Sequence, residues 1–379
     1  MIRSDNHPEY RQCVLSLMDN IADPDIVFDS EGASNYYHEF LQKKKQLVPV
    51  SEVAEMELLQ MIDEITKAGK GQKYNCIIGV SGGVDSTYVA FKAKELGLRP
   101  LLVHFDNGWN SETAVSNINK TLDKLGFDLY TYVLDWNEFK DLQIAYFNSG
   151  VVDIEVLTDH AIIAVLHKIA LKFSVSYILS GTNVATEATL PKSWIWNKTD
   201  HVNIRNIHKK FGTRKIKNYP FFDWQLKKTA QFKKVKVLPI LNYLNYQKAL
   251  AKKTIATELG WEDYGLKHGE SVFTRFYQGF ILPQKFAIDK RKAHLSDLIF
   301  SGQISKPEAL ELIKQTIYKP DELKRDMEFV LKKLDMTNSF FQNWIIEKGV
   351  DHSVYGFEKS IWQSNFLMKK LHNLRKKIK

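Results

Sequence analysis

The residues with the clearest chemical potential form one loop of small side chains, Ser81-Gly-Gly-Val-Asp-Ser86. An apolar run that ends at Val80 predicts a buried strand before the loop. Apolar residues at helical spacing after it predict a helix over residues 87–96, with Gly97 as its stop. A strand, a tight turn and a helix in this order direct backbone N–H groups and the positive end of the helix at one point. The loop therefore predicts a binding site for phosphate groups.

The residue types in the loop indicate which class of phosphate-binding site it forms. Gly82 and Gly83 let a phosphate approach the backbone closely, and Ser81 and Ser86 supply hydroxyl groups. The loop lacks the lysine of a Walker loop, which argues against a kinase or a GTPase. Asp85 would repel a phosphate unless a cation lies between them, so the sequence predicts a bound metal ion, expected to be Mg²⁺. The alternative is a glycine-rich turn in which Asp85 caps the helix.

Predicted strands and helices alternate from position 74 onward. This alternation predicts that the loop is positioned by a doubly wound α/β fold with a parallel sheet. Further strands are expected at residues 99–105, 128–134 and 176–180, and one more within 233–241. Helices are expected at 51–65, 111–125, 159–173 and 249–259, and residues 23–32 predict a turn, a short strand and another turn.

Sheets of this type bind ligands at the carboxyl ends of their strands, which selects the residues after the second and fourth strands. Asp106-Asn-Gly-Trp follows the second strand, and Gly181-Thr-Asn follows the fourth. Ordinary turn formation would explain these residue types equally well. The nucleotide-binding residues predicted outside the loop are His104, Asp106, Asn107, Gly181, Thr182 and Asn183.

The overall composition is that of a soluble globular enzyme, with 44% apolar and 26% charged residues among 379. Apolar runs fall short of a membrane span and the N-terminus lacks a signal-peptide pattern, so a cytoplasmic location is expected. Cys13 and Cys76 are too few for a disulfide framework and fit a reducing compartment. The net charge of +9 allows either an RNA partner or anionic small molecules.

The length predicts two or three units. The pattern along the chain divides it into an N-terminal segment (1–70), a nucleotide-binding domain (71–245) and a mainly helical region for substrate binding or interaction (246–379). Aromatic and basic residues mix between 191 and 246, which indicates either nucleic-acid stacking or an insertion packed over an active site. Between 267 and 296, Phe273, Phe276, Tyr277 and Phe280 fall at helical spacing and are expected in the core. The charged residues crowded into that stretch either bind an ionic substrate or form a solvated helix face.

The loop matches the S-G-G-x-D-S sequence of the N-type ATP pyrophosphatases, and the chain resembles this PP-loop superfamily. The resemblance implies that residues 81–86, Val84 included, hold the pyrophosphate of ATP while a substrate oxygen attacks the α-phosphate. It implies ATP and Mg²⁺ as cofactors, with Asp85 as the metal ligand. Ser81, Asp85 and Ser86 are then the expected catalytic residues of the loop.

The cysteine count limits the nucleophile in such a reaction. Cys76 lies in the predicted buried strand and Cys13 is remote in sequence, so persulfide chemistry is not expected. The chain shows neither a cysteine-centred triad signature nor an N-terminal nucleophile, since position 2 is Ile2. Ammonia, if it is used, must come from another polypeptide or from solution.

Segments 104–111, 181–187, 267–278 and 285–296 carry a more specific resemblance. Through them the chain is similar to the N-acetyl sugar amidotransferases of bacterial surface-polysaccharide and nonulosonic-acid pathways. The resemblance implies transfer of AMP to the acetamido oxygen of a sugar, after which ammonia displaces AMP and leaves an acetamidino group. Partners similar to the glutaminase and cyclase subunits of imidazole glycerol phosphate synthase would supply the ammonia.

The same resemblance implies an acidic, nucleotide-activated sugar as substrate, and His268, Glu270 or His294 as the group that takes the proton of attacking ammonium. A nucleic-acid partner is not expected, and a homodimer is left open. Two alternatives remain: a tRNA-modifying enzyme that acts by adenylation, and a nucleotide-binding subunit without catalysis. The expected substrate ligands are Glu187, Lys267, Arg275, Gln278, Lys285, Asp289, Lys290, Arg291 and His294.

The chain departs from these relatives near its N-terminus, where they commonly carry two cysteine pairs with zinc-ligand spacing. The corresponding positions here are Tyr10, Cys13, Ser34 and Tyr37, a degenerate zinc-ribbon-like start. A single thiol cannot hold a structural zinc. We therefore expect no metal there, with the two tyrosines packed in its place.

Overall fold

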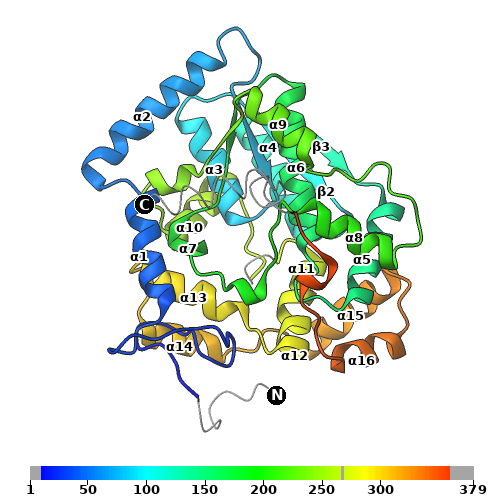
Figure 1. The fold of residues 1–379 in the computed structure, drawn as a ribbon. Coiled ribbons are helices and arrows are strands. Elements are labelled where there is room, and N and C mark those ends of the chain that lie inside the picture. The colour runs from blue at the N-terminus through cyan, green and yellow to red at the C-terminus, as the bar shows by residue number, and fades with distance from the viewer. Residues whose placement is uncertain (1–9, 266–268, 359–379) are drawn as a thin grey trace, which may run out of the picture.

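The computed structural model describes residues 10–265 and 269–358 (Figure 1). At its centre lies a five-stranded sheet in the order β3-β2-β1-β4-β5, in which all neighbouring strands are parallel. The predicted doubly wound α/β fold is confirmed, including the strand within 233–241. The strands are β1 (Cys76–Val80), β2 (Pro100–Asp106), β3 (Asp128–Val133), β4 (Tyr177–Leu179) and β5 (Lys236–Leu238).

The strand order reverses at β1, which is the feature that creates a binding crevice. Ile77 of β1 pairs with Leu101 of β2 on one side and with Ile178 of β4 on the other. The chain continues to β3 on the first side and to β5 on the second, and such a switch point opens a crevice at the carboxyl ends of the strands. The loop after β1 lies at this point.

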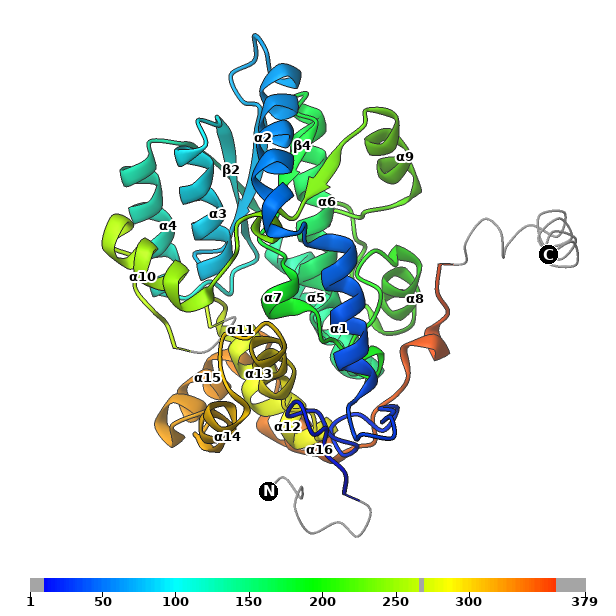
Figure 2. The ribbon, with the colours of Figure 1, turned by 90° about the vertical axis from the view of Figure 1, so that its left-hand side faces the viewer.

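Alternate residues of the strands face two helical layers (Figure 2). Ile78 and Leu102 face the layer of α3 (Val84–Glu95), α4 (Glu112–Leu125) and α10 (Lys248–Leu259), with α2 (Ser51–Ala68) beside it. Ile77 and Val103 face α6 (Val156–Lys172), against which α9 (Trp224–Phe232) packs. This burial of both faces explains why the inner strands β1, β2 and β4 are almost continuously apolar in sequence.

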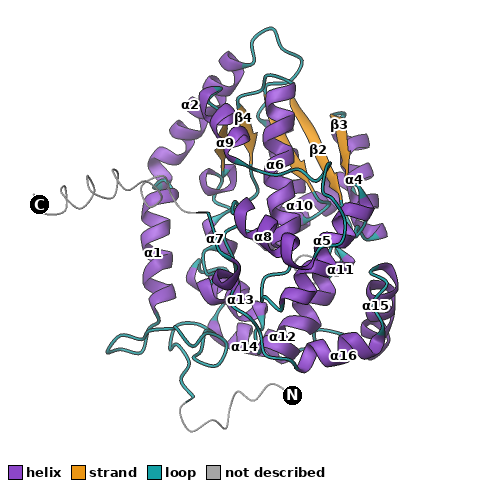
Figure 3. Ribbon diagram, turned by 45° about the vertical axis from the view of Figure 1, so that its right-hand side comes forward, coloured by secondary structure: helices purple, strands orange, loops and turns teal. Residues whose placement is uncertain are grey.

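The helices after α10 gather beyond one end of the sheet, as Figure 3 shows. They share an aromatic core with α5 (Trp136–Ser149) and α8 (His201–Phe211), and Phe273, Phe276 and Tyr277 are buried in it as predicted. These elements are α11 (Val272–Phe276), the π-helical turn η3 (Tyr277–Ile281), α12 (Leu282–Phe286), α13 (Lys290–Phe300), α14 (Lys306–Lys314), α15 (Pro320–Lys333), α16 (Asn338–Ile346) and η4 (His352–Tyr355). The predicted region boundaries near 70 and 245 stay a prediction.

The stretch 191–246, whose pattern is weak in sequence, is folded onto the rest of the chain. Trp194 and Phe221 are buried in the core, whereas Trp224 is 56% exposed. Besides α8, α9 and β5, the stretch holds η1 (Lys192–Trp194) and η2 (Ile240–Tyr243), and it follows the short α7 (Val184–Glu187). Most of its rings therefore support packing.

The N-terminal segment docks on the C-terminal helices together with α1 (Asn35–Leu47). The Leu17 N–H donates to Ser296 Oγ at 3.1 Å, and Lys306 Nζ donates to the Cys13 carbonyl at 2.8 Å. The short strand predicted within 23–32 is wrong. The segment forms turns and an antiparallel bridge between Phe28 and Ser34, because the carboxylates of Asp23 and Asp29 accept nearby backbone N–H groups that a strand would need for pairing.

Several predicted helix ends move by a few residues. The helix after the loop begins at Val84 and not at position 87, so the second half of the loop forms the first turn of α3. α4 ends, as predicted, at Gly126 in the left-handed conformation. Within residues 10–265 and 269–358, no helix is both long and apolar enough to cross a membrane.

Candidate active site

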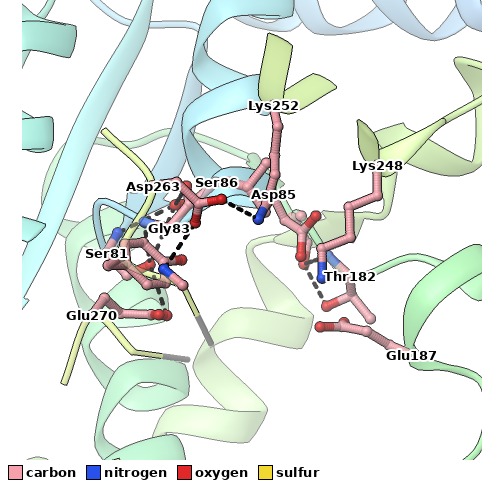
Figure 4. Close-up of a pocket in the computed structure, with 15 residues that line it drawn as sticks. Ser81, Gly83, Asp85, Ser86, Thr182, Glu187, Lys248, Lys252, Asp263 and Glu270 are labelled. Atoms are coloured by element: carbon pink, nitrogen blue, oxygen red, sulfur yellow. Dashed lines mark hydrogen bonds and ion pairs between the residues drawn. The ribbon is translucent and has the colours of Figure 1, made fainter. Parts of the chain in front are cut away.

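A pocket of about 210 Å³ opens at the carboxyl ends of β1 and β4 (Figure 4). Its walls come from the loop after β1, the loop after β4, and a segment that runs from α10 to Glu270. Figure 4 places Asp85 between a group containing Ser81 and Glu270 and a group containing Glu187 and Lys248. The lining residues are Ser81, Gly83, Val84, Asp85, Ser86, Ser180, Gly181, Thr182, Glu187, Lys248, Lys252, Asp263, Tyr264, Gly265 and Glu270.

The backbone of Gly82 fixes the shape of the loop. Its φ is +78°, and a Cβ atom added there would lie 2.4 Å from the carbonyl oxygen of Ala114 in α4. Its own carbonyl accepts hydrogen bonds from Trp261 Nε1 at 2.9 Å and Asn117 Nδ2 at 3.4 Å. Only glycine combines this φ with so close an approach, so the residue type at position 82 follows directly from the geometry.

Hydroxyl groups and backbone N–H groups converge within the loop. The Ser81 N–H donates to Ser86 Oγ at 3.3 Å, and the Gly83 N–H donates to Ser81 Oγ at 3.2 Å. Ser81 Oγ also lies 3.5 Å from Glu270 Oε1, to which it donates. These are the donors that a bound phosphate would recruit.

The N-terminus of α3 adds to the anion-binding character of the pocket. Its N-cap residue Gly83 makes no side-chain capping hydrogen bond, so the first N–H groups of the helix are not satisfied by a conventional cap. The loop after β4 closes on this helix end, since a Cβ at Gly181 would lie 3.1 Å from Asp85 Cβ and 3.3 Å from the Ser86 nitrogen. The helix dipole favours negative charge at this point.

Among the lining residues that the structure describes, carboxylates nevertheless outnumber lysines. Lys252 Nζ pairs with Asp263 Oδ2 at 2.7 Å, and Lys248 enters from the same helix one turn earlier. Such a lining repels a bare polyphosphate and suits one that carries divalent cations. The carboxylates are those of Asp85, Glu187, Asp263 and Glu270.

The donor set fits Mg²⁺ held jointly by the protein and a phosphate ligand. In the part of the chain that the structure describes, no three or more His, Cys, Asp or Glu side chains are placed to hold a metal ion together. Mg²⁺ needs no such cage, because it is usually bound through one or two carboxylates plus phosphate oxygens and water. Asp85, at the centre of the pocket, is suited to that role.

Two tyrosines, the buried Tyr246 and the half-buried Tyr264, orient the acidic groups. Tyr246 donates its hydroxyl to Asp85 Oδ1, and burial together with the Asp85 carboxylate raises the pKa of Tyr246. Burial and the Glu270 carboxylate likewise raise the pKa of Tyr264. Both phenols therefore stay protonated as donors. Sequence reasoning missed both tyrosines as site residues. It also missed Lys248 and Lys252, whose i, i+4 spacing places them on one face of a helix and could have indicated them.

The nucleotide-binding residues predicted in and directly after β2 do not line the pocket. His104 Nδ1 lies 3.1 Å from the Val80 carbonyl, and Asn110 Nδ2 lies 3.1 Å from His104 Nε2. Asp106 Oδ1 accepts the Gly108 N–H at 2.8 Å, and Asn107 Nδ2 donates to Thr158 Oγ1 at 3.2 Å. After β4, Gly181 and Thr182 line the pocket, whereas Asn183 caps α7 through the Thr186 N–H at 3.0 Å.

The predicted substrate ligands are dispersed: among those that the structure describes, Glu187 lines the pocket and the others do not. Arg275 forms a two-pronged ion pair with Asp326 (Nε–Oδ2 2.7 Å, Nη2–Oδ1 2.9 Å). Lys285 Nζ donates to the carbonyls of Trp344 and Glu347, and Arg291 pairs with Asp289 at 2.7 Å. His294 lies half-buried on α13. Lys267 and His268 lie outside the described residues.

Gln278 and Lys290 lie together at a second polar cluster that sequence reasoning missed. Gln278 Nε2 donates to Glu155 Oε2 at 3.1 Å, and Lys290 is close enough to act on the Glu155 charge. Lys198 Nζ bridges Asp153 (2.7 Å) and Asp159 (2.8 Å) beside them. We call this set the Glu155 cluster: Asp153, Glu155, Asp159, Lys198, Thr274, Gln278 and Lys290.

Neither cysteine is placed to act in the pocket. Cys76 is fully buried in β1, and that burial raises the pKa of its thiol. Cys13 is buried in the N-terminal segment, where its Sγ accepts the Ser34 N–H at 3.2 Å. Two tyrosines occupy positions at which the relatives carry zinc-ligand cysteines. Of these, Tyr10 has its Oη 3.4 Å from Asp19 Oδ2, and Tyr37 packs on Phe300.

Comparison with known proteins gives one family match and several remote structural similarities. Residues 270–371 match the family model described as LPS biosynthesis protein WbpG-like, C-terminal domain. A search of curated proteins returns no match. Similar solved structures include an NMN synthetase from Francisella tularensis (14% identity, TM-score 0.36, 76% of this chain and 98% of that chain). An NH3-dependent NAD synthetase from Campylobacter jejuni is similar at 11% identity and TM-score 0.31, covering 73% of this chain and 94% of that chain. The fold assignment rests on the strand order and not on these similarities.

Proposed function

We propose that the chain is a PP-loop protein that acts as an ATP-dependent amidotransferase. The Ser81–Ser86 loop at the switch point of the sheet supports the first part, and the match of residues 270–371 to the WbpG-like C-terminal domain of lipopolysaccharide biosynthesis proteins supports the second. The protein transfers AMP to the acetamido oxygen of an N-acetylated, nucleotide-activated acidic sugar. Ammonia then displaces AMP and leaves an acetamidino group for a bacterial surface glycan such as an O-antigen, a capsule or a flagellin glycan. In enzyme terms it is a C–N ligase that forms AMP and pyrophosphate.

One observation carries the proposal: the Ser81–Ser86 loop and Asp85 line a pocket at the switch point of a parallel sheet. The loop offers hydroxyl and N–H donors, the helix end attracts an anion, and Asp85 can bind Mg²⁺. A polyphosphate is the ligand that needs all three together. The WbpG-like C-terminal match supports a glycan precursor as the acceptor.

The chemistry explains why ATP is needed. An amide carbonyl is a poor electrophile for ammonia, and its oxygen is a poor leaving group. When that oxygen attacks the α-phosphate, a P–O bond forms and the bond to pyrophosphate breaks. Ammonia then forms a C–N bond at the acetamido carbon, and the C–O bond to AMP breaks with a phosphate as leaving group.

The chain's own residues serve the first of these steps. Ser81, Ser86 and the Gly83 N–H can hold the pyrophosphate oxygens and stabilise the charge that develops there. Lys248 and Lys252 lie where they can neutralise the same group. Bound Mg²⁺ would supply further charge neutralisation, and Asp85, oriented by Tyr246, would hold it.

We propose that a separate polypeptide of the glutaminase and cyclase type supplies the ammonia. Supporting this, the two cysteines of the chain are buried away from the pocket, so a glutaminase of the cysteine type is not built from them. Ammonium salts should replace the partner in vitro, because the free nucleophile is the same.

The test is pyrophosphate release from ATP with UDP-N-acetylglucosaminuronic acid and ammonium chloride. We expect release that depends on the sugar, and an amidino product one mass unit lighter than the acetamido substrate. Asp85→Ala should abolish release while the protein still unfolds in a cooperative urea transition, lowered by the loss of the Tyr246 hydrogen bond. Release that depends on tRNA would establish the tRNA-modifying alternative, and ATP binding without turnover would establish the non-catalytic one.

A further inference from the structure

Glu155 is a buried carboxyl group whose placement is unusual for a structural role. It is 7% exposed and occupies the N-cap position of α6, yet its side chain accepts no hydrogen bond from the first turn of that helix. Its carboxylate is instead directed at α11 and η3, where it accepts from Gln278 Nε2 at 3.1 Å and from the Thr274 hydroxyl. A capping residue that does not cap its own helix indicates another use for the carboxylate.

The Glu155 cluster lies within reach of the nucleotide pocket. Glu270 lines that pocket, and the next residue, Ser271, caps the helical rod that carries Thr274 and Gln278. Each helical residue adds about 1.5 Å, so Thr274 and Gln278 lie roughly 5 and 10 Å along the rod from Ser271. The rod therefore connects Glu270 at the pocket with the two side chains that contact Glu155. The π-helical turn at Gln278 is a feature that occurs often at functional sites.

The charges of the cluster favour a small cation beside Glu155. Asp153, Glu155 and Asp159 face the two lysines Lys198 and Lys290, which leaves one carboxylate in excess. Burial, with the Asp159 charge adding to it, raises the pKa of Glu155, while Lys290 opposes the change. Half-buried Thr274, Gln278 and Lys290 surround Glu155, so the group is not sealed in an apolar core.

Building on the proposed amidotransferase function, we propose that Glu155 is the catalytic base that takes a proton from ammonium before attack on the adenylated acetamido carbon. The proton passes from nitrogen to the carboxylate, which becomes neutral. The nitrogen lone pair then forms the C–N bond as the C–O bond to AMP breaks. Glu270 is less suited to this step because it lies beside Ser81, at the pyrophosphate end of the pocket.

The test compares ammonium with hydroxylamine as nucleophile. Hydroxylamine is a neutral base at neutral pH and needs no prior deprotonation, whereas ammonia is almost all ammonium. Glu155→Gln keeps the size of the side chain and removes the proton acceptor. We expect it to lower amidine formation from ammonium by about 10²-fold, the usual contribution of a general base, and to retain formation of the hydroxylamine product.

Glu138→Gln is the matched control. Glu138 is also 7% exposed, but its carboxylate accepts the backbone N–H groups of Lys217, Asn218 and Tyr219 at 2.9, 2.8 and 3.0 Å. That variant should lose stability and keep the ratio of ammonium to hydroxylamine turnover. For Glu155→Gln, raising the pH should narrow the deficit with ammonium, because more free ammonia is then present.

The outcomes separate the two proposals. If the wild-type protein releases no pyrophosphate with the sugar and either nucleophile, the proposed function fails and the role of Glu155 with it. If the wild type turns over and Glu155→Gln loses both nucleophiles equally, or neither, Glu155 is a structural residue. The amidotransferase function would then stand without it.

Discussion

Gly82→Ala tests whether the close contact between the phosphate loop and α4 shapes the site. An alanine at φ +78° costs about 1 kcal/mol in backbone strain. Its Cβ would lie 2.4 Å from the Ala114 carbonyl oxygen, so one of the two backbones must move by about 1 Å to restore an ordinary carbon–oxygen contact. Ala114 is fully buried in α4, and we therefore expect the loop to move.

That movement has two consequences that can be measured. It breaks the hydrogen bonds from Trp261 and Asn117 to the Gly82 carbonyl, about 1 kcal/mol each, so the free energy of unfolding should fall by about 3 kcal/mol in all. It also displaces the N–H donors of the loop, and a displacement of about 1 Å costs roughly 10²-fold in rate. Urea unfolding and pyrophosphate release measure the two effects.

Gly97→Ala provides the matched control. Gly97 has a similar φ of +69°, and a Cβ added there meets nothing within 4 Å. It should lose only the strain energy, about 1 kcal/mol, and keep full activity. Equal stability losses in the two variants, with pyrophosphate release intact in both, would refute the contact-based reasoning.

Three other predictions concern single side chains. His160 is fully buried, and burial lowers its pKa from 6.5 to about 4. As the pH falls, the imidazole of His160 is therefore protonated in the unfolded chain before it is protonated in the folded protein. The contribution of neutral His160 to the free energy of unfolding is complete above pH 6.5 and is lost as the pH falls towards 4, and it amounts to roughly 3 kcal/mol. In His160→Gln, this part of the pH dependence of the unfolding free energy should be missing. Tyr246→Phe removes the donor to Asp85 and should raise the Mg²⁺ concentration needed for half-maximal pyrophosphate release, with unfolding changed by at most about 1 kcal/mol. Arg275→Met removes the ion pair of the buried Asp326, which keeps the neutral Tyr318 hydroxyl as a donor, and should lower the free energy of unfolding by about 3 kcal/mol with an unchanged KM for the sugar. A raised KM at unchanged stability would instead support the predicted substrate role of Arg275.

The sequence by itself determined the phosphate loop and the sheet that carries it. The strand, turn and helix around residues 81–86 depend on glycine positions and apolar spacing within about twenty residues. Each of them can therefore be predicted from its own stretch of sequence. The alternation of such units along the chain then predicts a parallel sheet, whose carboxyl edge is the place for a ligand. The strand predicted within 23–32 failed for a local reason as well, because aspartate side chains compete for the backbone N–H groups of that segment.

Tertiary structure alone decided which distant side chains complete the site. Tyr246 reaches Asp85 and Trp261 reaches Gly82 across separations of 161 and 179 residues, and nothing in their own neighbourhoods marks them. The same holds for the charged stretch between 267 and 296, where Arg275 pairs with Asp326 while Gln278 meets Glu155. Local sequence sets the type of each element because backbone preferences act over a few residues. Whether a charged side chain meets an opposite charge, a buried carboxyl or a ligand depends on which surfaces pack together, and that is fixed only in the folded chain.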